Sequence, residues 1–191
     1  MASTATAAEL RCAGLEARLM AFVFDTIILL AFASVFVAIA LFQLLARSDF
    51  GDVDPPDSSF YTALGIIVAV IPFWLAFNLW LQASRGQTVG MYIVGIRIAR
   101  SDGGRLGLLS ALWRMLTLNP LLFHPVLAAA WILLAVFATM LSPNLVVLVV
   151  TATLAVLSLI APLIALVAVV QDKQRRALHD RIAGTLVVRT S

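Results

Sequence analysis

Charged residues are scarce in this chain, and their scarcity excludes a water-soluble fold. Asp, Glu, Lys and Arg make up 12% of the 191 residues, whereas hydrophobic residues make up 62%. The mean hydropathy is +1.04. A soluble domain of this size needs far more polar surface to cover its core. The composition therefore indicates an integral membrane protein.

Cysteine and histidine are also nearly absent. The single Cys12 cannot form a disulfide within the chain, and the two histidines, His124 and His179, are too few for a His-based metal site. No G-x-S-x-G, H-E-x-x-H or Walker pattern occurs. We therefore expect no enzymatic activity, no metal and no other cofactor. The basic pI of about 9.8 follows from membrane topology, so it gives nucleic-acid binding no separate support.

Long apolar runs, by contrast, are plentiful. A bilayer needs about 20 apolar residues for each crossing helix. Four runs have this length, at about residues 19–46, 61–83, 121–141 and 145–170. Pro72 and Pro162 fall inside the second and fourth runs, where each removes a backbone hydrogen bond and favours a kink. The sequence predicts an all-α membrane protein with four transmembrane helices, forming one domain over residues 13–191 after a flexible tail, residues 1–12.

The basic residues are distributed unequally between the two sides of the predicted membrane. Twelve of the thirteen fall on the side of the termini and of the segment 84–120, and only Arg47 lies on the other side, beside the acidic loop 48–59. Because positively charged loops stay in the cytoplasm, we expect both termini to be cytoplasmic and the protein to lie in the cell inner membrane. The expected partners are the bilayer and its anionic headgroups. A homodimer is a further expectation, and the sequence names no protein partner.

Two cytoplasmic segments, 84–120 and 171–191, are expected to fold at the membrane surface. Residues 106–118 place leucines and Trp113 at helical spacing, which predicts an interfacial amphipathic helix with Trp113 and Arg114 in the headgroup zone. Residues 91–99 alternate in part between apolar and polar, and Asp102-Gly103-Gly104 supplies a turn. We expect residues 93–99 to pair with residues 184–189 in a small two-stranded sheet.

Three motifs resemble, in order, those of the RDD family of bacterial multi-pass membrane proteins, which is named for one arginine and two aspartates. They are AGLEARLMAFVFD (13–25); GQTVG (86–90) with VGIRI (94–98) and the DGG turn; and DKQRRALHDRIAGTLVV (172–188). The resemblance implies that Arg18 and Asp25 are the first two name-giving residues. Asp172 and Asp180 both fit the third, and we favour Asp180. The resemblance implies no established activity, and transport of ions or small ligands is only a suggestion.

Asp25 is the only ionisable residue in the first apolar run. A carboxylate in hydrocarbon costs roughly 2.5–3.5 kcal/mol on insertion scales. Arg18, seven residues earlier, shares its helical face but lies about 10 Å away along the axis, so the two do not touch. Asp25 must therefore be neutral, hydrated or paired with another element. Its candidate partners are Asn78, Gln82, Arg114 and the cluster His179-Asp180-Arg181.

These polar residues support two hypotheses. In the first, the protein transports protons, cations or a small ligand: Asp25 is the ion site, His179 and Asp180 form an entry relay, and Arg18 tunes the charge. In the second, the protein is a membrane scaffold or assembly factor, and the same residues are structural. Removing one partner of such a buried network would cost roughly 3–5 kcal/mol. The residues concerned are Arg18, Asp25, Asp172, His179, Asp180 and Arg181. Because only one deep carboxylate and no inverted repeat are present, a complete transporter would require a dimer.

Overall fold

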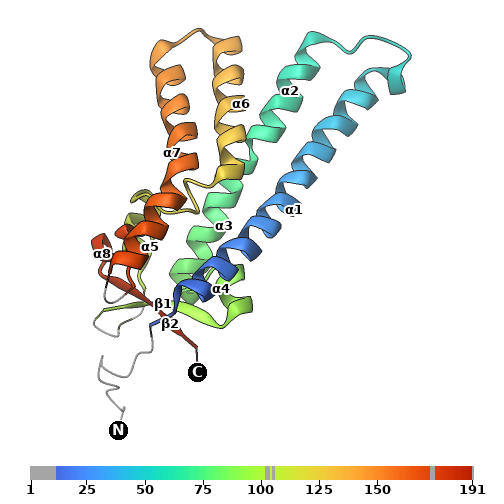
Figure 1. The fold of residues 1–191 in the computed structure, drawn as a ribbon. Coiled ribbons are helices and arrows are strands. Elements are labelled where there is room, and N and C mark those ends of the chain that lie inside the picture. The colour runs from blue at the N-terminus through green and yellow to red at the C-terminus, as the bar shows by residue number, and fades with distance from the viewer. Residues whose placement is uncertain (1–11, 102–103, 105, 173–174, 191) are drawn as a thin grey trace.

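The computed structural model describes residues 12–101, 104, 106–172 and 175–190, and it consists mainly of helices. Two helical hairpins stand side by side (Figure 1). In the first, α1 (Leu15–Arg47) is followed by α2 (Asp57–Val68) and α3 (Val70–Arg85), and in the second, α6 (Pro125–Leu141) is followed by α7 (Leu145–Gln171). The hairpin turns lie at one end of the molecule. The described part of the chain begins and ends at the other end, beside a small sheet, and we call this the sheet end (Figure 1).

Three helical stretches are long and apolar enough to cross a membrane: Leu15–Arg47, Asp57–Arg85 and Leu145–Gln171. Their surfaces are apolar as well, as side chains such as Ile27, Phe73 and Leu163 are 55%, 61% and 60% exposed. Exposed apolar surface on this scale is the mark of a membrane-facing protein. The prediction of an α-helical membrane protein is therefore confirmed.

The helix α6 is apolar but has only 17 residues, and it begins later than the predicted start of the third run at residue 121. Pro125 occupies its first turn, where a missing amide hydrogen costs nothing. His124 caps the helix, because its Nδ1 accepts a hydrogen bond from the Val126 amide at 3.2 Å. The chain just before is a turn, in which the Asn119 side-chain oxygen accepts from the Leu121 amide at 3.0 Å.

The second long stretch is interrupted at Ala69, three residues before Pro72, where the sequence predicts a kink. Pro72 has no amide hydrogen, and its ring crowds the carbonyl four residues earlier, at Val68, where α2 ends. The α-helix resumes at once, and the Phe73 amide donates to the Ala69 carbonyl at 3.3 Å. In contrast, α7 continues through Pro162 as a single helix.

The predicted two-stranded sheet is present. β1 (Ile96–Arg100) pairs antiparallel with β2 (Thr185–Arg189). The Ala13 amide also donates to the Val187 carbonyl at 2.8 Å, so the segment before α1 joins the sheet. Cys12, assigned above to the flexible tail, forms an isolated β-bridge with Val188. The rest of that tail, residues 1–11, and most of the predicted turn, Asp102-Gly103, lie outside the described residues.

The strand begins later than expected, because Val89–Val94 forms a short helix, α4. The Thr88 hydroxyl caps it by accepting from the Met91 amide at 3.1 Å. Gly95 ends it in the left-handed region, at φ 72°. The alternation across residues 91–94 was therefore a misleading signal for a strand.

Two further short helices complete the sheet end: α5 (Leu108–Leu116) and α8 (Leu178–Ile182). A helix is thus present where residues 106–118 predicted one. Its exposed side carries Leu108, Leu109, Trp113 and Leu116. The expected headgroup position of Arg114 is wrong, because this side chain is 2% exposed and pairs with Asp180 inside the protein.

Candidate functional site

A cavity of about 300 Å³ lies at the sheet end, where α1, α3, α5 and α7 meet. Its wall is largely apolar, with contributions from Phe22 on α1 and from Leu166 and Val169 on α7. The polar residues that line it are Arg18, Asp25, Gln82, Thr88, Arg114, Asn119 and His179. A concave, mostly apolar space with a few convergent polar groups has the form of a small-molecule site.

Asp180 forms ion pairs with both arginines of this cavity, Arg18 and Arg114. Its Oδ2 accepts from Arg18 Nη1 at 2.7 Å, and its Oδ1 lies 2.8 Å from Arg114 Nη2. The Asp180 side chain is completely buried, and those of Arg18 and Arg114 are 12% and 2% exposed. The three residues, which we call the Asp180 cluster, connect α1, α5 and α8.

The short helix α8 presents Asp180 through a local hydrogen bond. Asp180 is the third residue of α8, and its Oδ2 also accepts from the Ala177 amide, at 3.1 Å. An acidic residue in this position satisfies an amide that the first helical turn leaves free. The carboxylate is therefore fixed by its own backbone as well as by the two guanidinium groups.

The electrostatics of the Asp180 cluster leave it with net positive charge. Burial alone would raise the pKa of Asp180, but the Arg114 and Arg18 guanidinium groups hold this pKa well below its usual range. Two guanidinium groups therefore face one carboxylate. His179 Nε2 lies 3.6 Å from Asp180 Oδ1. Burial lowers the pKa of His179 to about 4 despite this neighbour, so its imidazole is neutral at pH 7.

Asp25 lies in the same cavity, but its hydrogen bonds go to the segment that begins α4. The Thr88 hydroxyl donates to Oδ2 at 2.6 Å, and the Gly90 amide donates to Oδ1 at 2.8 Å. The residue is 5% exposed. Neither donor is among the partners proposed from the sequence, which were Asn78, Gln82, Arg114 and residues 179–181. Arg18 and Asp25 share a face of α1 without pairing, as the helical spacing predicts.

Several buried polar atoms of the cavity residues have no hydrogen-bond partner among the described residues. They are both amide atoms of Gln82, Nε and Nη2 of Arg18, and Nε and Nη1 of Arg114. Gln82 is 1% exposed. Buried polar groups are nearly always paired, because an unpaired one costs about 1–3 kcal/mol. These atoms therefore offer hydrogen bonds to a ligand.

The remaining predicted residues lie apart from the cavity. Asn78 is buried on α3, where its Nδ2 donates to the Trp74 carbonyl at 3.0 Å. Asp172 sits near the surface, where it pairs with Arg176 at 3.3 Å and with Arg181 at 3.2 Å. The hydrogen bond from the Arg176 amide is the main reason why the pKa of Asp172 is lowered. Asp180 therefore joins Arg18, whereas Asp172 and Arg181 form a separate surface group.

Sequence reasoning missed Thr88, Gly90 and Asn119 as site residues. The position of Thr88 directly before a turn of helix could have identified it as a helix cap. Gly90 is required by the close approach of α4 to α1, because a Cβ there would lie 2.8 Å from Asp25 Cγ and would collide with the Ala21 carbonyl.

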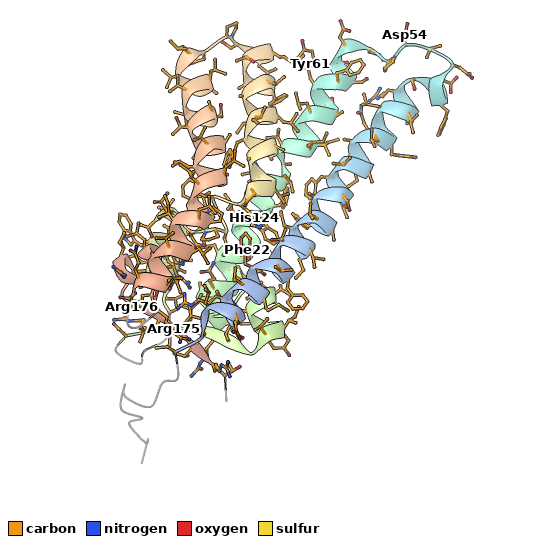
Figure 2. All side chains as sticks on the ribbon, viewed as in Figure 1. Phe22, Asp54, Tyr61, His124, Arg175 and Arg176 are labelled. Carbon is orange, nitrogen blue, oxygen red and sulfur yellow. The ribbon has the colours of Figure 1, made fainter. Side chains whose placement is uncertain are left out.

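His124 is also buried, but it does not line the cavity. Its ring stacks on Phe22 with 4.9 Å between centroids, and Figure 2 shows the two residues beside each other. Because Nδ1 accepts from the Val126 amide, Nε2 carries the hydrogen and donates to Thr26 Oγ1 at 3.0 Å. His124 thus ties the start of α6 to α1. Among the described residues, no three His, Cys, Asp or Glu side chains gather in a way that could hold a metal ion.

Comparison with known proteins agrees with the resemblance noted in the sequence. The sequence model of the RDD family matches residues 12–184, which is most of the chain. No curated protein and no solved structure matches significantly. The matched region includes both hairpins, the cavity and the Asp180 cluster. The chain therefore belongs to the RDD family.

Proposed function

We propose that this protein binds a small ligand in the sheet-end cavity and passes it between the membrane and the cytoplasm. The observation that carries the proposal is that Gln82, Arg18 and Arg114, which line the cavity, have buried polar atoms without a hydrogen-bond partner in the described part of the chain. A folded protein gains nothing from leaving such atoms unpaired. A bound ligand would satisfy them. The proposed role involves binding and release, without catalysis.

The proposed topology has four spans in the cell inner membrane. We assign α6 as the fourth span, since its 17 residues reach the lower limit of about 17 for a crossing helix. With four spans, the sheet end is cytoplasmic by the positive-inside rule. The charges support this orientation, since Arg175 and Arg176 lie near the sheet end and Asp54 lies in the loop at the opposite end (Figure 2). In this orientation the apolar face of α5, with Trp113, rests in the membrane interface.

The geometry supports a ligand better than a proton or a metal cation. Both oxygens of Asp25 already accept hydrogen bonds, from Thr88 and Gly90. The Asp180 cluster holds two cations and one anion, so it repels a further cation. Asp25 is therefore better explained as a structural acceptor than as an ion site.

A purely structural role is the second candidate, because Asp180 connects α1, α5 and α8 through two buried ion pairs. In this alternative the protein is a scaffold or assembly factor, and its basic cytoplasmic face contacts a partner protein or anionic lipid. The cavity would then have no ligand.

Native mass spectrometry of the detergent-extracted protein separates the two candidates. We expect the wild type to carry a small molecule that survives extraction, and Leu166→Trp, which fills the cavity from α7, to lose it. Leu159→Trp is the matched control, because Leu159 lies two turns away on the same helix and is 58% exposed. If wild type carries nothing, or if both variants retain the molecule, the ligand-binding role is wrong and the structural role stands.

A further inference from the structure

We infer that the ligand is an anionic amphiphile: a carboxylate or phosphate headgroup held by Arg18, Arg114 and Gln82, joined to an apolar chain that lies between α1 and α7. This inference rests on the proposed function and names its ligand class.

The headgroup part follows from the charge and the free donors of the Asp180 cluster. Two guanidinium groups share one carboxylate, so one positive charge is left without a counterion within the cluster. Each arginine also keeps two side-chain nitrogens without a partner among the described residues. A guanidinium fork binds carboxylate and phosphate oxygens through paired hydrogen bonds. An anion at this point would satisfy both the charge and the donors.

Gln82 adds a buried hydrogen-bond donor that has no partner among the described residues. Its side chain is 1% exposed, lines the cavity, and has neither amide atom paired within the described part of the chain. An amide NH₂ can donate to a headgroup oxygen, and its carbonyl can accept from a protonated phosphate or a hydroxyl group. Gln82 therefore suits an oxygen-rich headgroup.

Among the described residues, Asp25 is the only carboxylate that lines the cavity. Its two oxygens face the Thr88 hydroxyl and the Gly90 amide, at the start of α4. Both oxygens are thus occupied by these donors, whereas the arginines have nitrogens without a partner among the described residues. The anion is therefore expected beside Arg18 and Arg114 and away from the start of α4.

The apolar part of the ligand follows from the cavity wall. Leu19 on α1 and Leu163 on α7 line the cavity and are 44% and 60% exposed, so the cavity is open along these two helices. The cavity wall is therefore continuous with the apolar outer surface of the molecule. An acyl chain can lie along this wall while its headgroup reaches the arginines, as lipid tails and helix surfaces are equally apolar.

The test measures binding in phosphatidylcholine nanodiscs, which present no anionic lipid. The fluorescent fatty acid cis-parinarate reports binding, and four competitors are added in turn: oleate, lysophosphatidate, oleyl alcohol and inorganic phosphate. We expect oleate and lysophosphatidate to displace parinarate, and oleyl alcohol and inorganic phosphate to have no effect. Gln82→Leu and Arg18→Gln should each weaken parinarate binding at least tenfold.

Gln43→Leu is the matched control for Gln82→Leu. Gln43 also has a buried oxygen without a partner among the described residues, but it does not line the cavity. Its substitution should leave binding unchanged. Arg18→Gln also removes the ion pair with Asp180 and can therefore prevent folding. In that case, the effect of Gln82→Leu on parinarate binding decides whether the cavity holds the headgroup.

Three results would overturn the inference while leaving the proposed function in place. Displacement by oleyl alcohol as strong as by oleate would show that charge is not recognised. Displacement by inorganic phosphate as strong as by lysophosphatidate would identify a free anion in place of a lipid. Absence of parinarate binding in a protein that still carries a small molecule by mass spectrometry would point to another ligand class. If the wild-type protein carries no small molecule by native mass spectrometry and binds no parinarate, both the ligand-binding function and the ligand class are wrong.

Discussion

Asp25 joins two helices that are far apart in sequence. It is the only ionisable residue between Leu19 and Ala46 of α1, and it accepts hydrogen bonds from Thr88 and Gly90 at the start of α4. The backbone of a helix start has free amide groups, and a carboxylate is a strong acceptor for them. An acidic residue in an apolar helix thus has a structural use that does not depend on transport.

We predict that Gly90→Ala destabilises the protein by about 1–3 kcal/mol, the usual cost of overpacking. The added Cβ would lie 2.8 Å from Asp25 Cγ and would collide with the Ala21 carbonyl, so α4 must move away from α1. Thermal unfolding in detergent measures the change. Gly65→Ala is the control, since the nearest atom to its new Cβ is 3.7 Å away on Phe137. Equal stability of the two variants would contradict the close approach.

Asp180→Asn should cost roughly 3–5 kcal/mol of stability, because it leaves two buried guanidinium groups without their carboxylate. Chemical denaturation in detergent gives the free energy. Asp172→Asn should have a much smaller effect, because the Asp172 pairs with Arg176 and Arg181 lie near the surface and are weakened by solvent. A larger loss for Asp172→Asn than for Asp180→Asn would show that the wrong aspartate has been assigned to Arg18.

His179 should make stability depend on pH below about 6.5. Burial lowers its pKa to about 4, so between these two values the unfolded chain binds a proton that the folded protein does not. Stability therefore falls as the pH falls from about 6.5 to about 4, by on the order of 3 kcal/mol for this group. The charged groups that face the ring are Asp180, Arg114 and Arg18.

The measurement is the melting temperature of wild type and of His179→Gln at several pH values in that range. Subtracting the variant from wild type removes the contributions of the other titrating groups. We expect the difference to shrink as the medium becomes more acidic. A difference that does not change with pH would mean that His179 is not buried as a neutral group.

At the scale of the elements, the helices long and apolar enough to cross a membrane were predictable, and the short helices at the sheet end only in part. Long apolar runs identify spans because a bilayer demands length and hydrophobicity. The position of β2 also followed from its β-prone residues. α4 did not, because residues 91–94 alternate as a strand would, while the Gly90 amide donates to Asp25, 65 residues away. A local pattern carries no information about such a contact.

The sequence predicted many of the residues of the site but few of the contacts between them. Motif resemblance brought Arg18, Asp25 and Asp180 together, and the structure places Arg18 beside Asp180. The partner of Asp25 was missed because hydroxyl and backbone donors, unlike charged residues, leave no distinct signal in an apolar sequence. The burial of Arg114 was missed for a related reason: a basic residue on an amphipathic helix ordinarily faces the headgroups.

The exposed face of α5 should lie in the shallow part of the bilayer. In a Cys12→Ser background, a bimane label on Leu109→Cys is predicted to be quenched by lipids with a doxyl group near the headgroup more strongly than by lipids with a deep doxyl group. Leu109 is 67% exposed and lies on the apolar side of α5. A label on Arg97→Cys, in β1, should not be quenched by either lipid. Lack of quenching at position 109 would place α5 in water.

At the scale of the whole molecule, the cavity exists because the two hairpins and the sheet end meet there. α1 and α3 supply one wall, α7 another, and α5 and α8 close the cavity with Arg114 and His179. The Asp180 cluster holds this junction together and at the same time leaves donors free. The Asp180 cluster is therefore compatible with both hypotheses raised by the sequence, because it can stabilise the junction and bind a ligand at the same time.

The central claim is that the sheet-end cavity binds an anionic amphiphile, and mapping where such a molecule binds tests it most directly. Wild-type protein in phosphatidylcholine nanodiscs is irradiated with a fatty acid that carries a diazirine, and the labelled peptides are mapped by mass spectrometry. We predict adducts on Phe22 or Leu166, which line the cavity and are only partly exposed, and their disappearance when excess oleate is added. Adducts confined to outward-facing residues such as Val156 and Leu159, insensitive to oleate, would contradict the claim that the cavity is the binding site.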